Sequence, residues 1–193
     1  MSKQELELPT GWVKTALSQI SLINPKKPAH GSVDDELEVS FLPMKCVEEL
    51  TGQYDLSNNK KYCQVKKGYT YFKNGDIIFA KITPCMENGK IAIVDNLKND
   101  TGFGSTEFHV IRLNDELIRK YYFYYLIQDN FRYIAKQSMS GTAGQLRVSS
   151  SYLNETLIPL PPLNEQKRIV SKIEELFSKI DSTKQSLEQT KLQ

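Results

Sequence analysis

Short apolar runs bounded by turn signals dominate the middle of the chain. Alternating apolar and polar residues, rich in β-branched and aromatic side chains, are typical of strands. Asn88-Gly89 between two of these runs is a turn signal, and the residues from Thr83 to Asn88 make the connection a loop. The segments expected as strands are Glu38–Met44, Asp76–Ile82, Lys90–Val94 and Gly104–Leu113. They predict a β-rich centre.

Two regions around this centre follow a helical period. Apolar residues between Trp12 and Ile20 predict a short helix that packs the tryptophan inward. From Asp115 to Gln137 the spacing predicts an amphipathic helix or a helix pair. Its aromatic cluster from Tyr121 to Tyr125 is expected in the core rather than as a base-stacking surface, because large rings bury much area. Ser138–Gln145 predicts a flexible, glycine-containing loop that a ligand can approach closely.

The C-terminal segment has a different pattern. No proline or glycine occurs from Leu163 to Gln193, and Asn164 is expected as the N-cap of one continuous helix. At ~1.5 Å per residue this helix reaches roughly 45 Å. Apolar or small residues repeat along it at heptad spacing: Ile169, Ile173, Leu176, Ile180, Thr183, Leu187 and Thr190. This seam predicts a coiled coil with a second helix, and folding back onto the same domain is the alternative.

The elements predict an α+β protein in two parts. Residues 1–162 form a β-rich domain with flanking helices, and residues 163–193 form the coiled-coil helix. The composition, with 39% hydrophobic residues among 193, is that of a globular chain. No membrane span is expected, because the longest apolar runs have four residues. Without the apolar segment of a secretory signal at its start, the chain is expected to be cytoplasmic.

Three widely spaced cysteines, Cys46, Cys63 and Cys85, form no pair typical of a disulfide framework. They are expected to be reduced and buried. With only two histidines in the chain, no candidate ligands have the spacing of a structural zinc site.

Charge is unevenly distributed, although the formal net charge is only +2. Between Lys60 and Lys90 there are seven lysines against Asp76 and Glu87. A second basic stretch runs from Arg119 to Arg147. If the two stretches fold onto one face they form a phosphate-attracting surface. The alternative is a scattered, solvated surface.

Catalytic patterns are missing from the sequence. The segment Ile158–Leu163 superficially resembles the catalytic proline motif of adenine or cytosine methyltransferases. Leu160 and Leu163, however, stand where a hydrogen-bonding side chain and an aromatic ring are needed. Glu165 and Lys167 have the spacing of a nuclease motif but lack the clustered carboxylates that a metal requires. We therefore expect a binding protein without a cofactor or a metal, and an enzyme with a hidden site is a competing hypothesis.

Several segments together resemble one known family. The stretch from Leu157 to Val170 is long and unusual in composition, and Leu8–Trp12 resembles a domain opening. Residues 75–90 and Gly104–Phe108 resemble one subgroup of recognition domains. The family is that of the DNA-specificity subunits of type I restriction-modification systems. The resemblance implies a non-catalytic subunit that positions double-stranded DNA for methyltransferase (modification) subunits and a restriction endonuclease or translocase subunit. S-adenosylmethionine, ATP and magnesium would belong to those partners.

The chain departs from the family in one respect. Members usually carry two recognition domains and two spacer helices, and this sequence has one of each. It is therefore expected to be a half-subunit that dimerises, a truncated product or an excised piece. The heptad seam favours the first, a homodimer through Ile169, Ile173, Leu176, Ile180 and Leu187. Two identical domains would then read inverted half-sites separated by an unread spacer.

Candidate DNA contacts follow from the chemistry of readout, in which bidentate groups meet base edges and cations meet phosphates. The expected readers lie in two loops: Lys81, Thr83, Glu87, Asn88 and Lys90 in the first, and Thr142, Gln145 and Arg147 in the second. Ser105 and Thr106 are expected to support them, and the expected phosphate contacts are Lys60, Lys61, Lys66, Lys67 and Lys73. For each residue, turn chemistry or simple surface exposure is the alternative.

A second binding hypothesis uses the same lysines differently. The chain would bind single-stranded nucleic acid, with Tyr62, Tyr69, Tyr71 and Phe72 as stacking platforms.

Overall fold

The computed structural model describes residues 8–29, 31–142 and 144–191, and its contacts divide the chain into two compact units. The large unit is Lys14–Ile158. The small unit joins the N-terminal residues up to Val13 with Pro159–Gln193. Each unit is described by itself.

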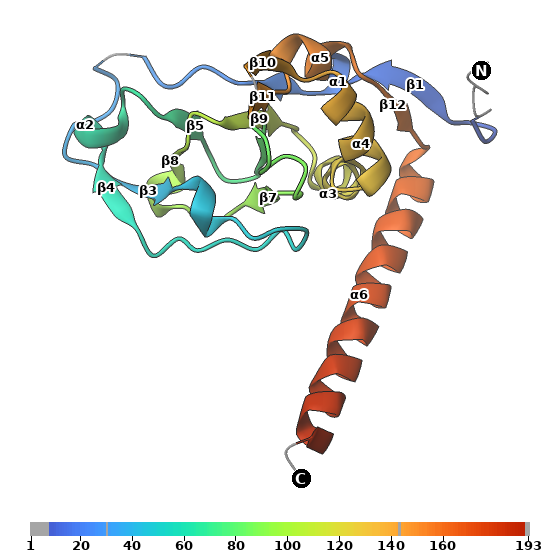
Figure 1. The fold of residues 1–193 in the computed structure, drawn as a ribbon. Helices are drawn as coiled ribbons and strands as arrows, with labels where there is room; N and C mark the ends of the chain where they lie inside the picture. Colours follow the sequence, from blue (N-terminus) through green and yellow to red (C-terminus); the bar gives the residue numbers. More distant parts are fainter. Residues whose placement is uncertain (1–7, 30, 143, 192–193) are drawn as a thin grey trace. The chain divides into compact units, whose positions relative to one another are not determined.

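Two four-stranded sheets form the centre of the large unit (Figure 1). The first has the order β2-β9-β6-β7 and is antiparallel throughout. The second has the order β4-β3-β8-β5, and only its β3–β8 pair is parallel. The strands of the first sheet are β2 Leu22–Ile23, β9 Phe108–Arg112, β6 Asp76–Ala80 and β7 Ile91–Val94. Those of the second are β4 Asn59–Lys61, β3 Glu38–Leu42, β8 Gly102–Gly104 and β5 Thr70–Phe72.

The main core lies where the two sheets meet. Every residue of β6 is buried, as expected of a central strand with neighbours on both sides. Ile78 and Val110 of the first sheet pack in one cluster with Leu42 and Phe72 of the second. A smaller cluster beyond the second sheet joins Val39, Tyr62, Val65 and Phe103. Apolar burial of this kind is the main driving force that holds such short strands together.

Helices flank the sheets. The longest of the large unit are α3 Glu116–Leu126, which contacts β7, and α4 Asp129–Gln137. Asp115 caps α3, since its side chain accepts a hydrogen bond from the Ile118 amide at 3.0 Å. The shorter helices are α1 Leu17–Ile20, α2 Tyr62–Val65 and α5 Ser150–Glu155, with 3-10 turns at Met44–Cys46 and Lys98–Asp100.

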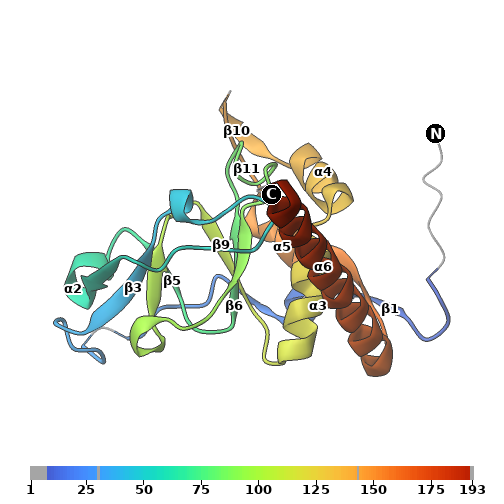
Figure 2. The same cartoon turned by 90° about the horizontal axis from the view of Figure 1, so that it is seen from below.

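The remaining strands form two small two-stranded sheets. In the large unit, β10 Ser140–Thr142 pairs with β11 Gln145–Arg147 as an antiparallel hairpin. In Figure 2, seen from below, β10 and β11 lie beside the segment that follows β6. The other sheet pairs β1 Val13–Ala16 with β12 Leu157–Leu160.

The small unit consists chiefly of α6, Leu163–Lys191. The carbonyl of Pro162 accepts hydrogen bonds from the amides of Glu165 and Gln166, at 2.9 and 3.0 Å. The helix therefore begins one residue before Asn164, and the expectation of an Asn164 N-cap is wrong. Leu176, Ile180 and Leu187 of the seam are about half exposed, at 48%, 48% and 57%. The side chain of Thr190 lies outside the described residues.

The fold class is confirmed as α+β, with a β-rich region and a long C-terminal helix. The region from Asp115 to Gln137 is a helix pair, and Tyr121 and Tyr122 are buried, as expected. Burial raises the pKa of Tyr121 to about 12. Among the described helices none is long and apolar enough to cross a membrane.

Several expectations about elements are wrong. Val13–Ala16 is a strand rather than part of a helix, and Trp12 is only half-buried. Gly104 belongs to β8 of the other sheet, so the segment expected as one strand from Gly104 is divided. The segment expected as a loop at residues 138–145 contains strand β10 and the first residue of β11, which pair as a hairpin. Cys63 is exposed and Cys46 and Cys85 are half-buried, so none of the three is fully buried.

Candidate nucleic-acid interface

The structure joins the two loops that were expected to read bases. Beyond the end of β6, Ile82 forms an isolated antiparallel bridge with Arg147. The Thr83 amide donates to the Leu146 carbonyl at 3.0 Å, and the Val148 amide donates to the Lys81 carbonyl at 2.9 Å. These backbone bonds hold residues 81–83 beside β11. We call this place the loop junction.

Arg147 is the most tightly held side chain of the loop junction. Its Nε and Nη2 donate to the two carboxylate oxygens of Glu107 at 2.9 and 2.7 Å, and its Nη1 donates to the Gln145 carbonyl at 3.0 Å. The bond from Arg147 lowers the pKa of the Glu107 carboxyl, which keeps it ionised. These bonds fix the guanidinium plane and use three of its five N–H groups, so one N–H on each Nη remains available in a defined orientation.

Glu107 is itself positioned by its neighbours. The Ser105 hydroxyl accepts a hydrogen bond from the Glu107 amide at 3.2 Å, in the turn that leads into β9. Ser105 therefore helps to position Glu107, the partner of Arg147, whereas Thr106 is exposed on the same turn.

The loop after Thr83 is tied to two other parts of the large unit. Glu87 forms an ion pair with Lys136 of α4 at 2.9 Å, and its carbonyl accepts from Arg132. Asn88 donates to the Glu49 carboxylate at 2.8 Å, and Lys90 donates to the Val47 carbonyl at 2.7 Å. Gly89 has a φ of 70°, which supports the turn that Asn-Gly predicts. Asn88 and Lys90 thus hold the loop in place.

In the hairpin, Thr142 and Gln145 are exposed. The Thr83 hydroxyl lies 3.7 Å from the Met139 sulfur, just before β10. Thr142, Gln145 and Arg147 therefore belong to one short hairpin whose base is fixed at the loop junction.

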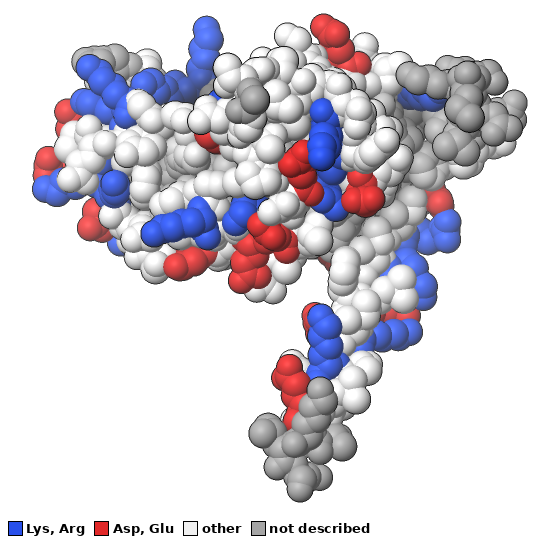
Figure 3. Space-filling view, in the orientation of Figure 1, with Lys and Arg blue, Asp and Glu red and all other residues white. Residues whose placement is uncertain are grey.

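The lysines expected as phosphate contacts lie elsewhere. Lys60, Lys61, Lys66 and Lys67 lie on or beside β4 and α2, at the end of the large unit opposite α3 and α4 (Figure 1). We call this place the lysine end. Figure 3 shows basic side chains gathered there with acidic ones beside them. Lys73 lies in another depression, with Arg119 and Arg112.

Ion pairs reduce the charge available at the lysine end. Lys61 pairs with Glu36 at 2.5 Å, and Lys66 pairs with Asp35 at 2.6 Å. The ammonium of Lys60 instead lies 4.1 Å from the centre of the Phe41 ring.

Sequence reasoning missed two residues that position groups at the loop junction. Glu107 was expected only as part of a strand, and no local pattern marks its pairing with Arg147 forty positions away. His109 is buried, with Nε2 2.8 Å from the Val148 carbonyl oxygen and Nδ1 3.0 Å from the Asn24 amide nitrogen. A carbonyl requires a donor, so Nε2 carries the proton. The Asn24 amide nitrogen donates to Nδ1, which therefore carries none, and the ring is neutral. Burial lowers the His109 pKa.

The aromatic residues do not form the stacking platform of the single-strand hypothesis. Phe72 and Tyr62 are buried in the two core clusters, and only Tyr69 is clearly exposed. That part of the hypothesis is wrong, because a buried ring cannot stack on a base. Among the described residues there is also no group of three or more histidine, cysteine or carboxylate side chains that could hold a metal ion.

Comparison with known proteins identifies the family. Residues 9–192 match the model of the type I restriction modification DNA specificity domain. The chain belongs to this family. The chain is 44% identical over 185 residues to the type I restriction enzyme EcoAI specificity subunit of Escherichia coli. This match covers 95% of the chain and 31% of that subunit. It is 42% identical to the EcoEI specificity subunit of the same species, covering 95% and 30%.

A solved structure agrees with this assignment. The specificity domain superposes on the HsdS subunit from Thermoanaerobacter tengcongensis with a TM-score of 0.76 and 26% identity, covering 96% of this chain and 46% of that one. The chain thus spans about a third of the length of the curated relatives it matches, and about half of the solved subunit. The resemblance noted in the sequence is confirmed.

Proposed function

We propose that this chain is a non-catalytic, sequence-specific reader of double-stranded DNA in a type I restriction-modification complex. Residues 1–162 would recognise the DNA, and residues 163–193 would act as the spacer and dimerisation helix. The observation that carries the proposal is the loop junction, because two loops rich in polar groups meet there around an arginine with a fixed orientation.

The proposed base readers differ in how free their side chains are. Arg147 presents a fixed guanidinium edge, which suits the O6 and N7 acceptors of guanine. Thr142 and Gln145 are exposed beside it, and Gln145 suits adenine. Lys81, Thr83 and Glu87 complete the surface, with Ser105 and Thr106 as support. Asn88 and Lys90 would act mainly by shaping the loop, given their bonds to Glu49 and Val47.

We propose that a second copy of the chain supplies a second DNA-recognition domain. The exposed seam of α6 provides an apolar stripe that a matching helix would cover. A two-fold pair would place two identical domains on inverted half-sites, with an unread spacer between them.

The proposed protein partners are methyltransferase and restriction subunits. The relatives are specificity subunits of type I restriction enzymes, and one similar solved structure describes the complex assembly of a type I restriction-modification system. Catalysis and its cofactors would belong to those partners.

Replacing Arg147 tests the base-reading role. The target is first found by co-expressing the chain with its methyltransferase partner and mapping the methylated bases of the host genome. We expect a bipartite motif with inverted halves. Arg147→Ala should then lower affinity for a duplex carrying that motif by roughly tenfold to a hundredfold, and lower affinity for a scrambled duplex far less.

Arg168→Ala is the matched control. Arg168 also forms a two-bond pair with a glutamate, Glu165, on α6. It should leave the ratio of target to scrambled affinity unchanged. Equal losses on both duplexes for Arg147→Ala would contradict base reading, and a motif without inverted halves would contradict the two-fold pair.

A further inference from the structure

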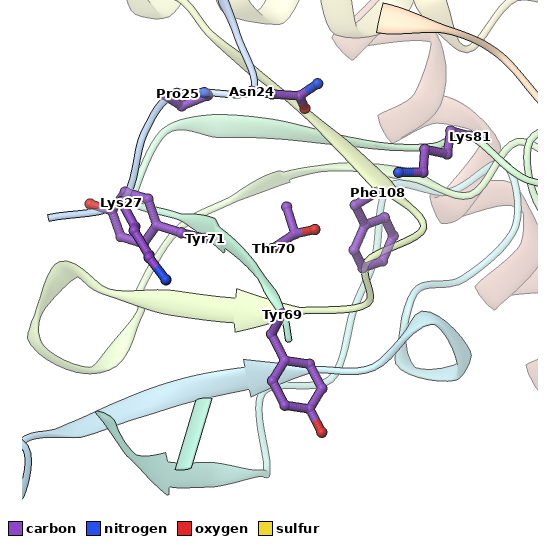
Figure 4. A pocket seen from close by; sticks show the side chains of 8 residues that line it. All are labelled: Asn24, Pro25, Lys27, Tyr69, Thr70, Tyr71, Lys81 and Phe108. Atoms are coloured by element: carbon purple, nitrogen blue, oxygen red, sulfur yellow. The ribbon is translucent and has the colours of Figure 1, made fainter. Parts of the chain in front are cut away.

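A groove of about 300 Å³ lies in the large unit, between the loop junction and the lysine end. Eight residues line it (Figure 4), and none of them is acidic. Lys81 points into it from the segment after β6, and Lys27 lines its opposite side. Its volume is at the lower limit of ligand sites, roughly 300–1,000 Å³. Its size and charge suit one unit of an anionic chain.

The two lysines carry charge that the fold leaves available. The Lys27 ammonium donates to the Lys66 carbonyl, which orients it without neutralising it. Neither Lys27 nor Lys81 has a carboxylate within ion-pair distance among the residues that the structure describes. The charge of Lys81 contributes to the lowered pKa of Glu107. Both oxygens of that carboxylate, however, accept hydrogen bonds from Arg147.

The groove also connects the two basic places. Lys81 belongs to the loop junction, and Lys27 reaches the lysine end through Lys66. Tyr69 lines the groove and packs edge-on against Phe41 at 4.9 Å between ring centres, with the Lys60 ammonium 5.8 Å from the Tyr69 ring. Unpaired positive charge therefore runs from Lys81 through Lys27 to Lys60.

We propose that this groove binds the phosphodiester backbone of the DNA whose bases the loop junction reads. The inference rests on the proposed function and refines it. It names Lys27 as a phosphate contact that sequence reasoning did not find, and it moves Lys81 from the base readers to the phosphate contacts. It also makes Lys61 and Lys66 weaker candidates for phosphate contacts, because Glu36 and Asp35 already neutralise them. A backbone contact supplies affinity and register rather than sequence preference.

The test is the salt dependence of binding to a duplex of arbitrary sequence. Each phosphate contact contributes about 0.9 to the slope of log affinity against log salt. Lys27→Ala and Lys81→Ala should each reduce the slope by about one, and the double variant by about two. Losses should be equal on target and scrambled duplexes. Unfolding midpoints equal to that of the unchanged chain establish that the variants fold.

Lys61→Ala is the matched control, since it removes the same charge from the lysine end where Glu36 opposes it. Its slope should stay unchanged. If the unchanged chain binds duplex DNA and the double variant keeps the full slope, the groove proposal is overturned and the proposed function stands. If Lys61→Ala matches Lys27→Ala, the charge is diffuse and the groove is again overturned. If the unchanged chain binds no duplex at any salt concentration, both proposals fall.

Discussion

Asp76 shows how a single buried charge can hold this fold together. It begins the central strand β6 with its side chain fully buried, and Arg112 of β9 donates to both of its carboxylate oxygens at 2.7 Å. The Lys73 amide adds a third bond at 2.9 Å. The carboxylate raises the pKa of Arg112, which keeps the guanidinium charged.

Removal of one partner should therefore strongly destabilise the folded protein. Asp76→Ala leaves the Arg112 guanidinium largely buried without its counter-charge, and we expect the free energy of unfolding to fall by about 3–5 kcal/mol. Urea unfolding followed by circular dichroism measures the change. Glu36→Ala removes a carboxylate from the exposed pair with Lys61 and should leave the midpoint unchanged. Similar midpoints for the two variants would contradict the role of burial.

His109 should make stability depend on pH. Burial lowers its pKa, the bond to the Val148 carbonyl and the charge of Glu107 oppose this change, and Lys81 reinforces it. Between the lowered pKa and the ordinary 6.5, the unfolded chain binds more protons than the folded one. The free energy of unfolding should therefore fall as the pH drops below 6.5, and His109→Gln should remove this part of the slope. An unchanged slope from pH 7 to 5 in the variant would contradict it.

At the scale of elements, the spacing of apolar residues predicts those helices and strands whose buried residues lie close together in the sequence. The all-buried β6 and the helix pair from residue 116 to 137 were foreseeable, because their apolar residues recur within a few positions. Strand β1 was not, because its pairing partner β12 lies more than a hundred positions along the chain. Non-local backbone pairing overrides propensity at β1. The hairpin β10–β11 was also missed, although its pairing is local, because its polar, glycine-containing sequence has no apolar alternation.

The candidate site follows the same rule. The polar loops around residues 83–90 and 141–147 could be selected from the sequence, since turn residues with amide and basic side chains are visible locally. Their meeting through the Thr83–Leu146 and Val148–Lys81 bonds could not, and neither could the fixing of Arg147 by Glu107. A sequence does not distinguish a paired lysine from an unpaired one. The ion pairs that neutralise Lys61 and Lys66 are therefore visible only in the structure.

At the scale of the whole molecule, the question is what covers the seam of α6. Leu176, Ile180 and Leu187 are about half exposed, while the ion pairs Lys172–Glu175 and Lys179–Glu175 lie away from these positions in the heptad. An exposed apolar stripe flanked by charged pairs is typical of a helix with a helical partner. For the isolated chain that partner is proposed to be a second copy.

A charge in the seam should then dissociate the pair. Ile180→Glu places two like charges near the two-fold contact, and light scattering should show a dimer becoming a monomer, with the midpoint of unfolding of the β-rich unit unchanged. Ser178→Glu adds the same charge on the opposite side of the helix and should leave the dimer intact. Because a monomer carries one reader, Ile180→Glu should bind a duplex with one half-site as well as the unchanged chain does, yet lose the gain from a second half-site. A monomeric unchanged chain at high micromolar concentration, or equal dissociation by both variants, would exclude pairing through this seam.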